Sequence, residues 1–137
     1  MSPEKIAFYL SLGLILVSSL LLVYRKLPKR LKHDRFNSRW KDIQKLCSDK
    51  SSWKKAITEA DDLLDKALKK KKIKGLSMGE RMVSAQNIFS NNDLVWFGHK
   101  LRTKLDSNPN TKVSQNDAKN ALMGIGQALK DIGALKK

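Results

Sequence analysis

The stretch IAFYLSLGLILVSSLLLVY, residues 6–24, contains nineteen residues and no charged side chain. A helix rises about 1.5 Å per residue, so the stretch covers about 28 Å, close to the hydrocarbon thickness of a bilayer. Its few polar groups are hydroxyls, which can bond within a helix or lie at the membrane interface. A soluble core helix would instead show a polar stripe at every third or fourth position. The stretch therefore predicts a single transmembrane helix, and we assign residues 1–24 to an N-terminal transmembrane anchor.

Basic residues gather on one side of this stretch. Lys5 is the only one before it, whereas six follow within residues 25–35. Basic residues near a span stay on the cytoplasmic side. We therefore expect a single-pass protein of the cell membrane, with its N-terminus outside and its C-terminal domain cytoplasmic. A cleaved signal peptide is the alternative, but the apolar run is longer than is usual for such peptides and no small-residue cleavage motif follows it.

Residues 25–35, RKLPKRLKHDR, are interpreted as a basic juxtamembrane linker. Pro28 disfavours a continuous helix through this segment. Anionic headgroups attract such segments by about 1 kcal/mol per basic residue near the surface, so membrane lipid is an expected partner. A topogenic signal without a lipid-specific role explains the same charges. The residues expected at the membrane interface are Tyr24, Arg25, Lys26, Lys29, Arg30 and Lys32.

The composition limits the rest of the chain to one small domain. Residues 25–137 are enough for a single hydrophobic core. The formal net charge is +15, and residues 36–137 alone hold 21 basic against 11 acidic residues, so the excess extends beyond the membrane flank. The only cysteine, Cys47, cannot form an intramolecular disulfide, and its apolar neighbours predict a buried reduced thiol.

Residues 36–137 show helical periodicity throughout and no alternation typical of strands. We expect an all-α fold, a single N-terminal transmembrane helix followed by a small bundle of four to five helices, most simply up-and-down. We assign residues 36–137 to this cytoplasmic helical bundle. The five predicted apolar stripes are Phe36, Trp40, Ile43 and Cys47; Trp53, Ile57, Ala60, Leu64 and Ala67; Met78, Met82, Ala85 and Phe89; Leu94, Phe97, Leu101 and Leu105; and Ala118, Ala121, Leu122, Ile125, Ala128, Leu129 and Ile132.

Polar residues before the stripes predict where helices begin. Gly124, Gly126 and Gly133 lie in the last predicted helix, which each weakens by about 1 kcal/mol relative to alanine unless a neighbouring helix packs closely against it. We expect such close packing. The predicted caps are Ser51 or Ser52, Ser77 with Glu80, Asn91 or Asn92, and Ser114 with Asp117.

The sequence lacks the common motifs of nucleotide-binding and zinc enzymes. It contains no phosphate-binding glycine loop and no H-E-x-x-H, and two histidines with one cysteine cannot build a structural zinc site, so we expect no metal and no cofactor. Asp61, Asp62 and Asp65 could form an acid/base pair or bind a metal, but a solvated helix face with nearby lysines is the favoured interpretation. On the fourth stripe, the spacing of His99, Arg102 and Asp106 predicts a polar edge with an Arg–Asp pair.

Three segments also carry a family resemblance. TEADDLLD (58–65), SMGERM (77–82) and LVWFGHKLRTKLDSNP (94–109) together resemble a family of uncharacterised, membrane-anchored bacterial proteins. The last segment of that family commonly reads W-x-A-H-K-x-R-N-x-I-A-H-E, which in turn resembles the R-x4-6-H signature of HEPN domains. HEPN domains are helical bundles and often ribonucleases. The matching residues in this chain are Trp96, His99, Lys100 and Arg102.

The resemblance makes Arg102, His99 and Ser107 a degenerate candidate catalytic site. Thr103 stands where the family usually has asparagine, and Ser107 stands in the position of the catalytic-type histidine. A serine hydroxyl does not titrate near neutral pH and cannot replace histidine in proton transfer. We therefore expect no ribonuclease activity.

Two functions from different classes fit the sequence. The favoured one is a non-enzymatic interaction module at the inner membrane surface, which binds a protein partner or a second copy of itself. The alternative is a HEPN-like module that binds RNA, although the aromatic residues needed for stacking on bases fall mostly on core stripes. The candidate phosphate-binding residues are Lys69, Lys70, Lys71, Lys72, Lys74, Lys100, Arg102 and Lys104.

Overall fold

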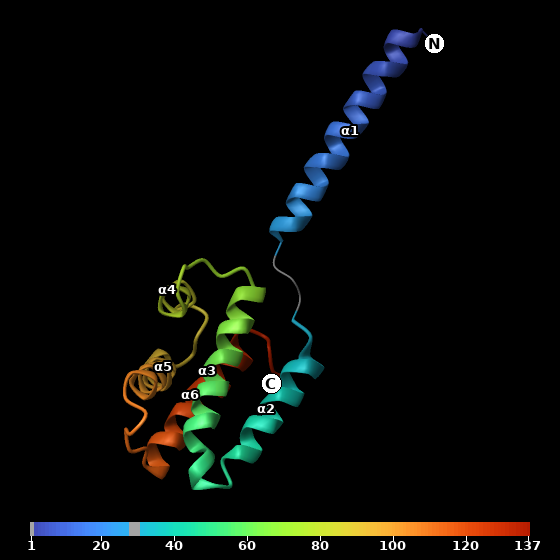
Figure 1. Cartoon of the computed structure of the whole chain (residues 1–137). Coiled ribbons are helices and arrows are strands. Elements are labelled where there is room, and N and C mark those ends of the chain that lie inside the picture. Colours follow the sequence, from blue (N-terminus) through green and yellow to red (C-terminus); the bar gives the residue numbers. More distant parts are fainter. Residues whose placement is uncertain (1, 28–30) are drawn as a thin grey trace.

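The computed structural model describes residues 2–27 and 31–137 (Figure 1). Within these residues the chain forms six α-helices, one short 3-10 turn and no strand, so the predicted all-α class is confirmed. One helix is the apolar N-terminal one, and five follow it. The elements are α1 (Pro3–Lys26), α2 (His33–Leu46), η1 (Lys50–Ser52), α3 (Trp53–Lys70), α4 (Met78–Ser84), α5 (Asn92–Ser107) and α6 (Gln115–Asp131).

Helix α1 is long and apolar enough to cross a membrane, and none of its residues is buried. In Figure 1 it stands clear of the other helices. The hydroxyls of Ser11, Ser18 and Ser19 each donate to a carbonyl of the preceding turn at 2.8 Å, so their hydrogen bonds are satisfied inside the helix. The helix ends where Leu27 becomes extended, as is usual for a residue that precedes a proline in the sequence.

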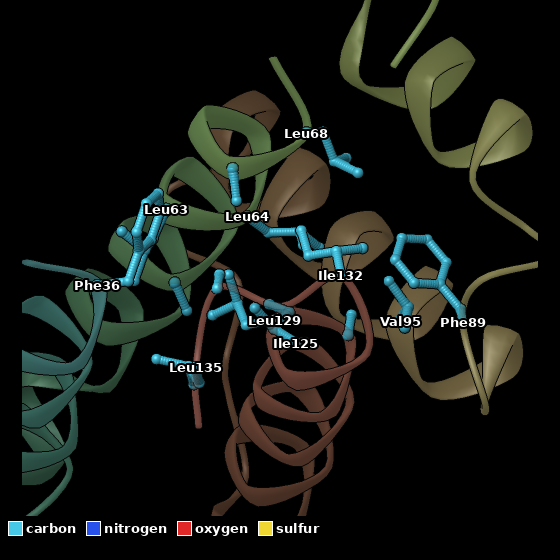
Figure 2. Packing of buried hydrophobic residues seen from close by; sticks show 14 of the residues in the cluster. Phe36, Leu63, Leu64, Leu68, Phe89, Val95, Ile125, Leu129, Ile132 and Leu135 are labelled. Atoms are coloured by element: carbon cyan, nitrogen blue, oxygen red, sulfur yellow. The ribbon is translucent and has the colours of Figure 1, made fainter. Parts of the chain in front are cut away.

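The other helices pack around α3, which buries eight of its residues. The start of α2 lies beside the end of α3, because the Lys70 ammonium is 5.6 Å from the centre of the Phe36 ring. The main core contains side chains from every helix of the bundle, and Figure 2 shows how those of α2, α3, α5 and α6 meet. Leu31, which precedes α2, belongs to this core and is only 4% exposed.

The predicted linker is therefore shorter in the structure. Helix α1 continues through Arg25 and Lys26, and α2 begins at His33, inside the segment that we expected to be irregular. Leu31 is held by the core rather than lying against headgroups. The expectations for Pro28, Lys29 and Arg30 lie outside the described residues.

The arrangement of the helices is also not simply up-and-down. In Figure 1, α5 is seen nearly end-on while α2, α3 and α6 run across the picture, so α5 is steeply inclined to them. Helices α3 and α6 run in the same direction. Ile57 and Ala118, near their N-terminal ends, belong to the same small core cluster, and just beyond their C-terminal ends Lys71 approaches Gly133.

The expected close packing is confirmed at Gly124 and Gly126 but is wrong at Gly133. Gly133 follows α6 in a left-handed conformation, and the nearest atom to an added Cβ would lie 4.0 Å away. A Cβ placed on Gly124 would lie 2.4 Å from the carbonyl oxygen of Leu94 on α5, a distance no side chain can occupy. A Cβ on Gly126 would lie 2.7 Å from the indole of Trp40 on α2. Gly124 therefore lets α6 pack against the backbone of α5, and Gly126 lets it pack against the indole ring of Trp40 on α2.

The helix starts agree with the sequence at three places and differ at one. Ser77, Asn91 and Ser114 each accept the backbone N–H three residues ahead. In the Ser77 box, Glu80 accepts from Leu76 N rather than from the cap residue itself. Neither predicted serine caps α3 through its side chain. Asp49 instead caps η1, the turn that leads into α3.

The predicted apolar face of α5 is wrong by part of a turn. Val95 is buried there, at 1% exposed, while Phe97 is 36% exposed. Gly98 and Leu105 complete the buried face. The shift arises because the close approach of α6 at Gly98 and Gly124 sets which side of α5 is covered.

Candidate functional site

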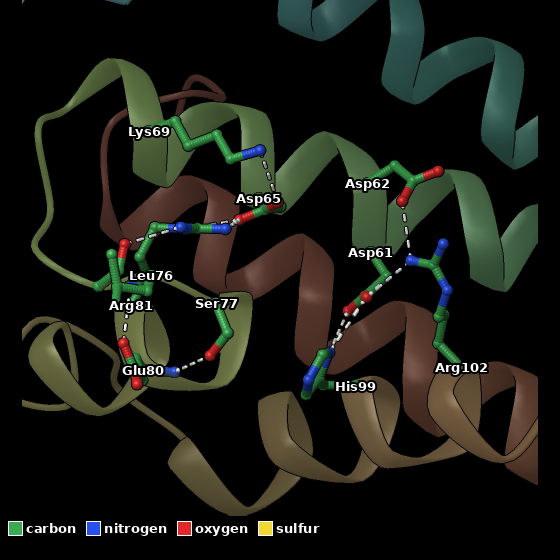
Figure 3. A network of polar contacts seen from close by, with 11 residues as sticks. Asp61, Asp62, Asp65, Lys69, Leu76, Ser77, Glu80, Arg81, His99 and Arg102 are labelled. Carbon is green, nitrogen blue, oxygen red and sulfur yellow. Dashed lines mark hydrogen bonds and ion pairs between the residues drawn. The ribbon is translucent and has the colours of Figure 1, made fainter. Parts of the chain in front are cut away.

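A polar cluster joins α3 to α5, with Asp61 at its centre. Asp61 is 1% exposed, and among the described residues only it and Arg81 are charged and buried. Its carboxylate accepts a hydrogen bond from Arg102 Nη1 at 3.0 Å and lies 3.1 Å from His99 Nδ1. Figure 3 shows both side chains reaching from α5 toward the aspartate. The favoured interpretation of this aspartate as a solvated carboxylate is therefore wrong, because α5 covers it.

Arg102 is held by three carboxylates. Besides Asp61 it binds Asp62 at 2.7 Å, and its Nε lies 2.6 Å from Asp106, the predicted partner one turn away. Burial of the guanidinium opposes its charge, but the hydrogen bonds to Asp62 and Asp61 and the charge of Asp106 outweigh this and raise the pKa of Arg102 above its ordinary value. Two carboxylates therefore occupy Nη1, and the positive charge of the guanidinium is balanced within the chain.

Asp65, one turn after Asp61, ties α4 to α3 in the same way. It lies 2.7 Å from Arg81 Nη2 and 3.3 Å from Lys69 Nζ. Arg81 also donates to the carbonyl oxygen of Gly75 at 3.0 Å, which fixes the loop before α4 (Figure 3). Asp61 and Asp65 are thus paired, each with a different neighbouring helix.

The imidazole of His99 is oriented by Asp61 and Trp96. Its Nδ1 faces Asp61, and its ring forms a T-shaped contact with Trp96, with the centroids 6.0 Å apart. The nearby hydroxyls are used locally, since Thr103 donates to the carbonyl oxygen of His99 and Ser107 to that of Lys104. Among the described residues no hydroxyl or thiol bonds to the imidazole. In the described part of the chain, no group of three or more His, Cys, Asp or Glu residues could hold a metal ion.

The candidate phosphate-binding lysines form two separate groups. Lys69, Lys71, Lys72 and Lys74 lie at or just after the end of α3, with Lys70 against the Phe36 ring. Lys100 and Lys104 are exposed on α5. On α3, Asp62 pairs with Arg102 and Asp65 pairs with Lys69. These two carboxylates therefore lie between Arg102 and the lysines at the end of α3. The structure therefore does not join the two groups into one basic groove through Arg102.

An open groove of about 580 Å³ lies between α2 and α6, a feature that the sequence analysis missed. Trp40, Cys47, Trp53, Leu122 and Met123 supply its apolar surface. The described residues that line it include lysines and glutamines but no carboxylate. The available signal was Met123, which stands just outside the predicted stripe of α6 and is 54% exposed. The basic and amide residues of the lining are Gln44, Gln115, Lys119, Gln127 and Lys130.

Cys47 is half-buried at one side of this groove and is a free thiol. The Sγ of Cys47 lies 3.5 Å from the carbonyl oxygen of Ile43, and Trp53 Nε1 donates to the carbonyl oxygen of Cys47 at 2.9 Å. Burial raises the pKa of the thiol. The prediction of a reduced cysteine on an apolar stripe fits this position, although the side chain is only partly covered.

The predicted membrane-interface residues lie at the end of α1 and the start of α2. Tyr24 is 77% exposed, Arg25 and Lys26 lie in the last turn of α1, and Lys32 is an exposed residue before α2. Lys29 and Arg30 fall outside the described residues.

Comparisons with known proteins identify no relative. No family model, curated protein or solved structure matches the chain. The likeness to HEPN domains thus stays a prediction from the sequence motif.

Proposed function

We propose that this protein is a single-pass membrane-anchored helical bundle that acts as a non-enzymatic interaction module at the inner membrane surface. One observation carries the proposal: the 24-residue helix α1 is uncharged over residues 6–24, and the rest of the described chain buries none of it. An apolar helix left uncovered in water is unfavourable, whereas a bilayer covers it. The six basic residues within 25–35 support a cytoplasmic bundle, because basic residues near a span stay on the cytoplasmic side.

The polar cluster supports a structural rather than a catalytic role. A general acid or base must reach a reacting group, and an anion-binding arginine must present free N–H groups. Arg102 instead meets three carboxylates of its own chain, and Asp61 is covered. The cluster is best explained as a clamp between α3 and α5. Measurable RNA hydrolysis that Arg102→Ala abolishes would overturn this part of the proposal.

The groove between α2 and α6 is the surface that we assign to the partner. Its apolar surface and volume suit side chains from one face of an amphipathic helix. Lys119 and Lys130 line it and no described lining residue is acidic, so a helix with acidic flanking residues is the complementary occupant.

The anchor and the groove are tested separately. A reporter fused after Lys137 should be cytoplasmic, and a cysteine introduced at Ser2 should react with an impermeant reagent added to intact cells. The opposite labelling pattern would reverse the topology. Recovery of the protein in the soluble fraction would contradict the proposed membrane anchoring by α1.

For the groove, the purified full chain in neutral nanodiscs is titrated with an acidic amphipathic peptide. Trp40 and Trp53 line the groove, so binding should change their indole emission. The Lys119→Glu/Lys130→Glu variant should lose the change. The matched control is the same peptide with lysines in place of its acidic residues, which should not bind to the native protein. Equal responses to both peptides, or to neither, would contradict the assignment.

A further inference from the structure

The end of the bundle from which the chain leads to α1 carries an unusual loop, residues 71–77, after the last turn of α3. This end is identified by the core itself: Leu31 is buried there, and Phe36 of α2 contacts Lys70 of α3. Five residue steps separate Leu31 from the last residue of α1, a reach of at most about 18 Å. Once α1 is in a membrane, this end of the bundle stays close to the membrane surface.

The loop presents a fully exposed leucine on a fixed backbone. Leu76 is 97% exposed, although three side chains of α4 hold the backbone around it. Glu80 accepts from Leu76 N at 2.6 Å, Arg81 donates to the Gly75 carbonyl at 3.0 Å, and Ser84 donates to the Lys74 carbonyl at 2.8 Å. A flexible loop could fold such a side chain back, whereas this loop holds it outward.

Three lysines precede the leucine in the loop, and one of them occupies a position that normally favours glycine. Lys72 adopts a left-handed backbone with φ of 59°, and Ile73 N bonds to the Leu68 carbonyl, which together end α3. Helix α6 ends with the same pattern but uses Gly133 at the left-handed residue. A side chain at this position is disfavoured by sterics. The sequence therefore has a lysine in this loop at a position where glycine would be less strained.

The two carboxylates that contact the loop and the end of α3 are already engaged. Asp65 pairs with Arg81 and Lys69, and Glu80 holds the Leu76 amide. The exposed loop itself contains Lys71, Lys72 and Lys74 and no acidic residue. A basic surface with an apolar side chain at its tip matches an anionic bilayer, which attracts lysines at its headgroups and accepts the leucine below them.

We propose that residues 71–77 form a second membrane contact, in which Lys71, Lys72 and Lys74 bind anionic headgroups and Leu76 inserts among them. This inference rests on the proposed anchoring by α1. Docking holds the α3 end of the bundle against the inner leaflet. It also assigns these lysines to lipid phosphates rather than to RNA.

The test uses the full chain in vesicles of phosphatidylcholine alone or of an equimolar mixture with phosphatidylglycerol. A nitroxide on Leu76→Cys, in a Cys47→Ala background, reports its surroundings through its relative accessibility to oxygen and to a water-soluble nickel complex. In anionic vesicles the label should gain oxygen access and lose nickel access. In neutral vesicles, or at high salt, it should remain aqueous. A label on Asn110→Cys, in the turn between α5 and α6 beside the start of α3, should remain aqueous in both.

Charge variants separate a specific face from general attraction. Replacing Lys71, Lys72 and Lys74 by glutamine should lower the ratio of docked to undocked loop by about fivefold per lysine. The matched control replaces Lys50, Lys104 and Lys112, which lie near the other end of the bundle, and should leave the ratio unchanged. Equal loss in both variants would overturn the proposal.

A further variant distinguishes docking from a structural role of the turn. Lys72→Gly should make the bundle more stable to denaturant yet reduce docking. If docking is unchanged both in the Lys72→Gly variant and in the variant with three glutamines, the inference is contradicted.

The outcomes also separate this inference from the proposed anchor. If the chain floats with both kinds of vesicle while the label at position 76 stays aqueous, only this inference fails. If the chain does not float with either, the anchor itself fails. Protection of the label by single-stranded RNA on neutral vesicles would reassign the lysines to nucleic acid and also overturn it.

Discussion

Replacement of Asp61 by asparagine tests the clamp between α3 and α5 most directly. The substitution keeps the shape of the side chain but removes its charge. The carboxylate now receives a hydrogen bond from Arg102 at 3.0 Å and faces His99 at 3.1 Å, while only 1% of Asp61 is exposed. A hydrogen bond to a charged group contributes about 1.5–3 kcal/mol, and asparagine can keep one acceptor. We therefore expect the free energy of unfolding to fall by about 2–4 kcal/mol.

Asp62→Asn is the matched control, because it removes the neighbouring charge from the same arginine. The Asp62 side chain is 61% exposed, so its pair with Arg102 should contribute less than about 1 kcal/mol. The measurement is urea unfolding of the full chain in mild detergent, followed by far-ultraviolet circular dichroism. Equal effects of the two substitutions would refute the reasoning, and so would stabilisation by Asp61→Asn, since burial of the charge would then outweigh its bonds.

Three further predictions concern packing and the free thiol. Gly124→Ala should destabilise the bundle by about 1–3 kcal/mol, because the added Cβ would meet the backbone of Leu94. Gly126→Ala should have a smaller effect, because the Trp40 indole can move and alanine favours the helix. The reverse order in urea unfolding would contradict the observed contacts. Leu31→Ala should lower the free energy of unfolding by about 2–5 kcal/mol, and a negligible change would contradict the burial of Leu31 in the core. Cys47 should react with iodoacetamide along a pH curve displaced to higher pH than that of a small solvated thiol, because burial raises its pKa; coincident curves would disprove this.

Features encoded by neighbouring residues could be predicted from the sequence. The caps at Ser77, Asn91 and Ser114 depend on one side chain and a backbone N–H three residues away, so spacing alone identifies them. The assignment of segments as helices rather than strands follows from the apolar periodicity of neighbouring residues in the same way. The error at Val95 and Phe97 has a different origin, because the covered side of α5 is set by the approach of α6 at Gly124, and periodicity fixes only a broad face.

The candidate site could be predicted only in part, for the same reason. The pair between Arg102 and Asp106 is one helical turn apart and was expected. The contacts of Asp61 with His99 and Arg102 join residues 38 and 41 positions apart, and the sequence contains no local signal for them. A carboxylate beside lysines is usually solvated, and only the position of α5 reverses that outcome at Asp61. The groove between α2 and α6 likewise exists only after the helices have packed.

The burial of Leu31 also determines how strong any contact with the surrounding membrane needs to be. Because the core holds the chain at Leu31, only residues 27–30 separate the packed bundle from the end of α1. A short tether raises the effective concentration of one binding site near another to about the millimolar range. A surface patch with a dissociation constant near a millimolar would thus be substantially occupied in the anchored chain, yet the same patch would bind too weakly to be detected on a detached bundle at micromolar concentration.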